Sequence, residues 1–266
     1  MKSPISPLSE RIPRFVRQVM SAAPWRPLSR LDLPELMDGA DWTDDELRAN
    51  FRDIRRINRL AGGVSAILDE LPSLLRDVPS DREAVILDLG TGSADIPLAI
   101  VRWARRQQRP VRVIASDASP AMLAIAWEHT ASIPEIELER RDARAVPMPD
   151  RSVDVVLCSL TLHHFPPDEA CAILAEMRRL ARAGFVVNDL VRNRRAYAAA
   201  WLTARLFTRN RLTRHDAPLS VLRAYTPAEL AELLHMSGAT GARVHTRPLF
   251  RMVGVWQAPP DATRPM

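Results

Sequence analysis

The apolar residues in the middle of the chain alternate between two patterns. Short runs rich in valine, isoleucine and leucine are typical of strands buried on both faces, and they predict strands at 84–89, 111–116, 136–140, 153–159 and 183–188. Stretches with apolar residues at helical spacing predict helices at 94–106, 119–130 and 168–181. This alternation favours an α/β fold with a mostly parallel sheet, whose ligands bind at the carboxyl ends of the strands.

The first part of the chain follows other patterns. Residues 1–40 are rich in proline and show no sustained period, which predicts an arm draped over the surface or a partly disordered segment. From Thr43 a helix is indicated by a capping box with Glu46 and by an apolar stripe to Leu60, with further helix beyond it. We therefore expect an N-terminal arm and helical lid over residues 1–80.

The alternation is interrupted after the fifth strand. A helical stretch containing Tyr197 and Trp201 is followed by TRNRLTRHDAPLS, which we interpret as a basic loop at 208–220. Together they predict an inserted helical cap at 190–225.

The remaining residues complete the predicted sheet. A second capping box begins a helix at Thr226, and 242–246 and 250–256 are typical of a closing pair of strands. The predicted fold is a doubly wound, mostly parallel seven-stranded α/β sheet over 81–257, followed by a flexible tail at 258–266.

The most informative segment is VILDLGTGSADIP, in which a strand ends at Asp88 and a helix follows. Gly90 and Gly92 let the backbone turn tightly and approach a ligand, which the amide groups at the start of the helix would face. Asp117, at the end of the next strand, can accept hydrogen bonds from both ribose hydroxyls of a nucleoside. These elements predict a nucleoside site at one edge of the sheet.

Dinucleotide-binding enzymes use a similar arrangement, but their third glycine is replaced here by Asp95. A pyrophosphate needs that uncluttered helix start, whereas a nucleoside with an amino-acid arm does not. The sequence therefore favours S-adenosylmethionine over a nicotinamide dinucleotide. Asp142, just after the third strand, is placed to accept a hydrogen bond from the adenine amino group, although an ordinary turn aspartate fits the same pattern.

These segments, together with DVVLCSLTLHHF at the fourth strand, resemble the class I S-adenosylmethionine-dependent methyltransferases over residues 85–184, especially their ubiquinone-biosynthesis-like small-molecule group. The resemblance implies a Rossmann-like fold with S-adenosylmethionine as cofactor. It places the amino-acid arm on LDLGTGSAD, the ribose on Asp117 and the adenine on Asp142. Ala94 departs from the pattern, since a third glycine is common there. The expected cofactor-binding residues are Asp88, Gly90, Thr91, Gly92, Asp117, Ala118, Asp142, Ala143 and Ser159.

Methyl transfer requires an acceptor aligned with the sulfonium and shielded from water, and a phenol or enol acceptor also benefits from a base. Histidine titrates in the useful range, so His163 and His164, directly after strand four, are candidate bases, as is His215 beside Asp216. The two consecutive histidines can equally cap a helix or pack against the cofactor.

Other residues are candidates for contact with the acceptor or the lid. Asn188, at the end of the fifth strand, is placed to orient a substrate hydroxyl. Tyr197 and Trp201 lie four apart on a predicted helix and could form an apolar roof over a flat substrate, although core packing also accounts for them. Asn58 and Arg59 are candidates for bringing the lid over the cofactor.

Composition narrows the class of protein. The chain has 266 residues, 47% of them apolar, with only two cysteines, so we expect a globular enzyme without disulfides or a bound metal. No apolar run is long enough to span a bilayer, and we expect no signal peptide and a cytoplasmic location. A homodimer is compatible with the sequence. Residues 178–223 hold eleven arginines against two aspartates, which either attracts an anionic partner or reflects coding bias.

The favoured function is methylation of a small molecule, at a phenolic or polyketide-like oxygen or an activated ring carbon, as in secondary metabolism. Three alternatives remain open: a nucleic-acid methyltransferase that uses the basic segment, a non-catalytic protein that binds S-adenosylmethionine, and a nicotinamide-dependent oxidoreductase. The exit of strand four, SLTLHHF, argues against nucleic acid because it lacks the Asn/Asp-Pro-Pro-aromatic element of enzymes that methylate base amino groups.

Overall fold

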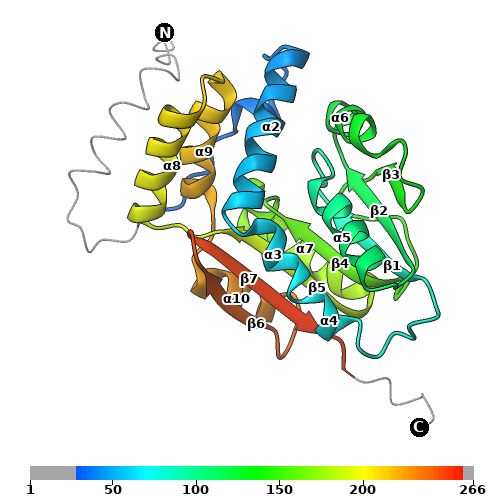
Figure 1. Ribbon diagram of the computed structural model, residues 1–266. Helices are drawn as coiled ribbons and strands as arrows, with labels where there is room; N and C mark the ends of the chain where they lie inside the picture. Colours follow the sequence, from blue (N-terminus) through cyan, green and yellow to red (C-terminus); the bar gives the residue numbers. More distant parts are fainter. Residues whose placement is uncertain (1–27, 260–266) are drawn as a thin grey trace.

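The computed structural model describes residues 28–259, and a seven-stranded sheet forms its centre (Figure 1). Most of the predicted N-terminal arm and of the predicted tail lies outside these residues. The strands are β1 (Ala84–Leu89), β2 (Val111–Asp117), β3 (Ile136–Arg140), β4 (Val153–Ser159), β5 (Ala181–Leu190), β6 (Arg243–Arg247) and β7 (Arg251–Gln257).

The order across the sheet is β3-β2-β1-β4-β5-β7-β6, with β7 antiparallel to both of its neighbours and the other strands parallel. This confirms the predicted doubly wound, mostly parallel sheet. The strand order reverses between β1 and β4, and ligands of such sheets bind at the carboxyl ends of the strands beside this reversal. A ligand site is therefore expected at the turns that follow β1, β2 and β4.

Helices cover both faces of the sheet. The α-helices are α2 (Asp44–Leu60), α3 (Gly63–Leu68), α4 (Leu71–Leu74), α5 (Asp95–Arg106), α6 (Pro120–Thr130), α7 (Pro167–Leu180), α8 (Arg194–Phe207), α9 (Arg211–Arg223) and α10 (Pro227–Met236), and two 3-10 turns are η1 (Leu36–Asp38) and η2 (Leu162–His164). In Figure 1, α3, α4 and α5 lie in front of the sheet and α7 and α10 behind it.

The central strands are apolar on both faces because each face packs against helices. Along β1, Ile86 belongs to the core formed with α3, α4 and α5, whereas its neighbour Leu87 belongs to the core formed with α7. Both side chains are fully buried. Burial of a leucine or isoleucine contributes roughly 1.5–3 kcal/mol, so these two layers supply most of the driving force for the sheet.

The two predicted capping boxes are present. The Thr43 side chain accepts a hydrogen bond from the Glu46 amide and the Glu46 carboxylate accepts one from the Thr43 amide, and Thr226 and Glu229 repeat the arrangement. These bonds satisfy amide groups that the first turn of a helix leaves unpaired. The sequence alone therefore predicted where α2 and α10 begin.

The predicted basic loop at 208–220 is wrong, because most of it forms the helix α9. The side chain of Asn210 accepts a hydrogen bond from the Thr213 amide and begins the helix, and Pro218 lies inside it. Leu212 and Leu222 are buried against neighbouring elements. The segment was predicted as a loop because its arginines and proline interrupt the apolar pattern. It nevertheless forms a helix because packing against α8 and α2 outweighs its poor helix propensity.

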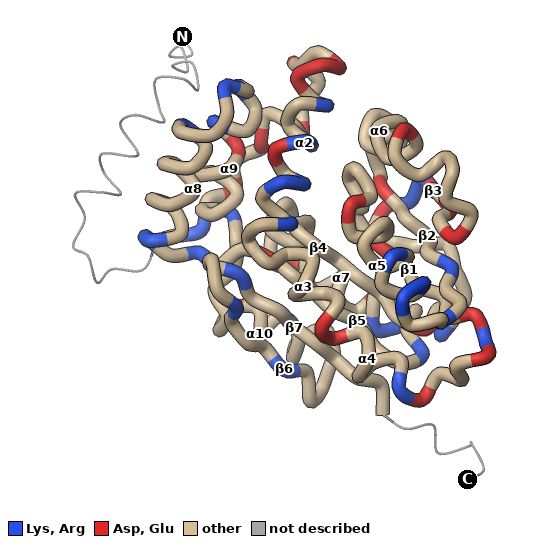
Figure 2. Tube along the Cα trace, viewed as in Figure 1, with Lys and Arg blue, Asp and Glu red and all other residues tan. Residues whose placement is uncertain are grey.

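The eleven arginines of residues 178–223 do not form one continuous basic surface. The side chains of Arg192 and Arg223 are only 5% exposed and bond to Glu229 and Asp38, respectively. Figure 2 shows acidic residues among the basic ones around α2 and α9. Much of the positive charge of residues 178–223 is thus neutralised by ion pairs within the fold. No helix in the described range is both long and apolar enough to cross a membrane.

Candidate active site

The bend after β1 requires glycine at two positions. Gly90 and Gly92 have positive φ angles of +70° and +53°, which L side chains rarely adopt. A Cβ at Gly90 would lie 2.4 Å from the Thr161 side chain, and one at Gly92 would lie 2.8 Å from Cε1 of Phe51 on α2. The bend is therefore enclosed between the exit of β4 and the helix α2, the predicted lid.

Asp117 faces this bend, as the sequence analysis expected. Its Oδ2 accepts a hydrogen bond from the Gly92 amide at 3.0 Å, and its Oδ1 accepts one from the Ser119 amide at 3.0 Å. Burial raises the pKa of the Asp117 carboxyl despite these bonds. The ends of β1 and β2 thus bring a carboxylate and a glycine turn together at one edge of the sheet.

Several buried polar atoms around the bend find no hydrogen-bond partner among the described residues. They are Asp88 Oδ2, Thr91 Oγ1 and Ser93 Oγ, and Asn188 Oδ1 on β5 is unpaired as well. Most buried polar side-chain atoms in folded proteins are paired, so a group of unpaired ones indicates a ligand site or bound water. Burial, together with the nearby Asp95 and Asp117 charges, raises the pKa of Asp88 to about 7. This carboxyl would gain from a cationic ligand group.

The other predicted cofactor residues lie around the same edge. Asp142 follows β3 and pairs with Arg144 at 2.7 Å, the contact of an ordinary turn aspartate, and the adjacent Ala143 is buried. The carbonyl of Ala118 accepts a hydrogen bond from Arg140 Nε, and Ser159 Oγ accepts one from Asn188 Nδ2 at 2.8 Å. Their contact with a cofactor stays a prediction.

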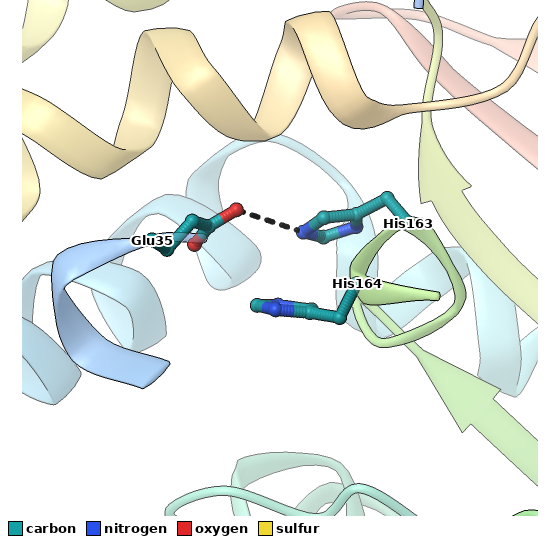
Figure 3. Close-up of side chains that lie close together, drawn as sticks. All are labelled: Glu35, His163 and His164. Carbon is teal, nitrogen blue, oxygen red and sulfur yellow. Dashed lines mark ion pairs between the residues drawn. The ribbon is translucent and has the colours of Figure 1, made fainter. Parts of the chain in front are cut away.

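His163 lies in η2, directly after β4, and contacts two carboxylates. Its Nδ1 is 2.7 Å from Oδ1 of Asp189 at the end of β5, and its Nε2 is 3.6 Å from Oε1 of Glu35 (Figure 3). The His163 amide also donates to Asp189 Oδ2. The side chains of all three residues are at most 3% exposed. The fold thus places this ring between two buried carboxylates.

These charges decide the protonation state of His163. Burial acts to lower the pKa of the imidazole, but Asp189 and Glu35 outweigh burial and raise it to about 10. Burial also acts to raise the carboxyl pKa values of Glu35 and Asp189, and in both cases the histidines outweigh it, so both pKa values are lowered. At neutral pH the ring is an imidazolium between two carboxylates.

His164 and Glu35 complete the group drawn in Figure 3. The Nδ1 of His164 lies 3.1 Å from Oδ1 of Asp38, and the rings of His163 and His164 are 4.4 Å apart at their centroids. One potential ligand atom each from Glu35, His163 and His164 lies within 4.8 Å of the others. This set has donors that suit a divalent cation. Ion pairs already balance its charges, and the predicted absence of a metal stays a prediction.

The segment that carries Glu35 and Asp38 is fastened over η2 by residues distant in sequence. Arg223 on α9 donates to the Leu33 carbonyl at 2.8 Å and to the His164 carbonyl at 2.6 Å. Sequence reasoning missed Glu35, Asp38 and Arg223 as residues of the site, because no local pattern connects the N-terminal segment, η2 and α9.

The third candidate base, His215, lies on α9. Its Nδ1 is 2.7 Å from Oδ1 of Asp216, which also accepts a hydrogen bond from the Leu36 amide. Its buried Nε2 has no partner among the described residues. The structure confirms the pairing with Asp216 but shows no contact between His215 and His163. A catalytic role for His215 stays a prediction.

Tyr197 and Trp201 lie on α8, outside the group around His163. Tyr197 is buried in a small core with Leu28 and Leu222, and the Trp201 ring lies 4.0 Å from the guanidinium of Arg205. These contacts account for both aromatic residues by packing, the alternative that their helical spacing left open. Contact with a substrate stays a prediction for both.

Comparisons with known proteins agree with this geometry. Residues 86–184 match the family described as "Methyltransferase domain". The malonyl-[acyl-carrier protein] O-methyltransferase of Marinomonas sp. is 37% identical over 92 residues, which are 35% of this chain and 33% of that protein. The chain covers about a third of the length of the curated relatives it matches.

Solved structures share the fold over a longer range. A SAM-dependent methyltransferase from Aquifex aeolicus superposes with a TM-score of 0.55 at 16% identity, covering 82% of this chain and 99% of that one. The CMeT domain of the citrinin polyketide synthase superposes with a TM-score of 0.54 at 13% identity, covering 70% of this chain and 49% of that one. At these identities the likeness shows the fold.

The residues at the bend fit S-adenosylmethionine, because its ammonium group complements the buried, unpaired Oδ2 of Asp88 and its ribose hydroxyls complement the part-buried carboxylate of Asp117. The finer grouping with ubiquinone-biosynthesis-like enzymes stays a prediction. Residues 86–184 thus match the methyltransferase-domain family, and the seven-stranded sheet, whose bend after β1 faces Asp117, shares the fold of solved S-adenosylmethionine-dependent methyltransferases.

Proposed function

We propose that this protein transfers the methyl group of S-adenosylmethionine to a small molecule whose reacting oxygen or carbon must lose a proton, such as a phenol or an enol. One observation carries the proposal: His163, at the exit of β4, is held by Asp189 at 2.7 Å. A histidine oriented by a buried carboxylate is suited to accept a proton. An acceptor that reacted without losing a proton would not need this pair.

The roles of the residues follow from their positions. The bound cofactor supplies a methyl group already activated by the sulfonium. Asp117 and the amides of the bend bind the nucleoside, and Asp88 faces the positive end of the amino-acid arm. Phe51 and the segment around Glu35 keep water out. Asp189 holds the proton on Nδ1 of His163, so that Nε2 is the atom that receives the proton of the acceptor.

Glu35 regulates this base. Its carboxylate faces Nε2 and keeps the imidazole protonated, a state that cannot accept a proton. An acceptor hydroxyl that takes the place of Glu35 beside Nε2 removes one of the two negative charges around the ring. The pKa of His163 then falls towards neutrality, and the residue becomes a base when the acceptor is bound.

Chemistry and fold support a phenolic or polyketide-like acceptor. The base suits acidic hydroxyls and activated ring carbons, and a polyketide synthase CMeT domain shares the fold. Nucleic acid is less well supported, because buried or ion-paired arginines such as Arg192 and Arg223 take up part of the basic segment. The acceptor, a cytoplasmic location and a homodimer are parts of this proposal.

The test combines binding with turnover. The purified chain would be incubated with methyl-labelled S-adenosylmethionine and a panel of phenols, resorcinols and β-diketones, and products identified by mass spectrometry. We expect a methylated product that disappears in His163→Asn, while that variant still binds S-adenosylhomocysteine in calorimetry. Asp117→Ala should lose cofactor binding itself. Labelling of DNA or tRNA in place of the panel, or unchanged turnover in His163→Asn, would overturn the proposal.

A further inference from the structure

A fully buried arginine lies at the same edge of the sheet. Arg251 is the first residue of β7 and pairs with Leu190 at the end of β5. Because β7 runs antiparallel to β5, its first residue lies level with the carboxyl ends of the parallel strands. Arg251 is 1% exposed and is among the largest fully buried side chains. An arginine in this position needs an anionic partner, because burying an unpaired charge is strongly unfavourable.

The described residues do not supply that partner. The only hydrogen bond from the Arg251 side chain to them runs from Nη2 to Asn58 Oδ1, at 2.9 Å. Both Nε and Nη1 are buried without a hydrogen-bond partner in the described range. The carboxylates of Asp189 and Asp95 act on the guanidinium through their charges, but among the described residues neither is hydrogen-bonded to it. The guanidinium therefore presents two unused donors.

The contacts of Arg251 place it beside the glycine bend. Asn58 Nδ2 donates to Asp95 Oδ2 at 2.9 Å, and Asp95 is the first residue of α5, three residues after Gly92. A Cβ at Gly63 would lie 3.1 Å from Arg251 Cζ, so this glycine of α3 makes room for the guanidinium. Arg251, Asn58 and Asp95 thus form a chain from β7 to the helix start that faces the cofactor site.

We propose that Arg251 binds the carboxylate of the amino-acid arm of S-adenosylmethionine, which makes it a residue that selects for the complete cofactor. The inference rests on the proposed cofactor site. The arm carries one carboxylate, and a hydrogen-bonded guanidinium–carboxylate pair is among the strongest polar contacts in proteins. Asp88, on the other side of the bend, suits the ammonium of the same arm.

Ligands that differ only in this arm provide the test. Calorimetry would compare S-adenosylhomocysteine, its analogue lacking only the carboxylate, and 5′-methylthioadenosine, which lacks the arm. We expect Arg251→Met to weaken S-adenosylhomocysteine binding by roughly 10–100-fold while changing the affinities of the two other ligands by less than about threefold. Arg251→Lys, which keeps the charge, should retain part of the preference for the carboxylate.

Arg247→Met is the matched control, because Arg247 lies on the neighbouring strand β6 and pairs with Asp69 and Glu70 outside the site. It should leave all three affinities unchanged. Equal weakening of all three ligands in both Arg251 variants would overturn the inference and make Arg251 structural, while the cofactor proposal stood. A wild-type protein that binds none of the three would instead refute the proposed function. If Arg251→Met fails to fold, as judged by circular dichroism, the Lys variant decides. A reduced but remaining preference for the ligand with the carboxylate supports the inference, and an unchanged preference or equal weakening of all three ligands overturns it.

Discussion

Replacing Glu35 by Gln should lower the pKa of His163 by two to three pH units. The two side chains face each other across 3.6 Å and both are nearly inaccessible to water. With an effective dielectric constant of about 20, a pair of unit charges at this distance interacts by roughly 4–5 kcal/mol. Since about 1.4 kcal/mol corresponds to one pH unit, the upper limit of the shift is roughly three to three and a half units. From about 10 in the wild type, the pKa of His163 should fall to between about 7 and 8.

The measurement needs no acceptor. Histidines labelled with ¹⁵N and ¹³C would be titrated by NMR, with the His163 signals assigned through His163→Asn. Asp38→Asn is the control, because Asp38 pairs with His164 and not with His163. It should leave the His163 titration in place. A wild-type His163 that titrates near its ordinary pKa, or one that Glu35→Gln does not move, would refute the charge balance inferred here.

Two further predictions concern stability. Gly92→Ala should lower the free energy of unfolding, measured by urea titration, by about 1–3 kcal/mol. The added Cβ would lie 2.8 Å from Phe51, in a backbone conformation that disfavours side chains. An unchanged free energy of unfolding would contradict this steric argument. The pKa of His163 is raised on folding, so its contribution to stability is fully present below about pH 6.5 and is lost as the pH rises through about 10. The wild type should therefore lose stability between about pH 7 and 10 more steeply than His163→Asn, and equal slopes in thermal unfolding across that range would rule out a buried imidazolium.

The sequence by itself determined the sheet and the glycine bend that Asp117 faces. Strands buried on both faces are continuous apolar runs, and helix starts such as Thr43 carry their own caps, so these features depend on residues close together in the chain. The same holds for Gly90 and Gly92, whose backbone conformation only glycine adopts easily. Asp117 was placed correctly because parallel strands end at one edge of the sheet.

Only the tertiary structure decided what surrounds His163 and Arg251. Glu35 lies 128 positions before His163, and Arg251 lies 193 positions after Asn58, so no periodicity connects either pair. Packing likewise made α9 a helix where local propensity favoured a loop. The physical reason is that caps and turns are stabilised by neighbours in sequence, whereas the protonation of a buried histidine and the partner of a buried arginine depend on charges that only the folded chain brings together.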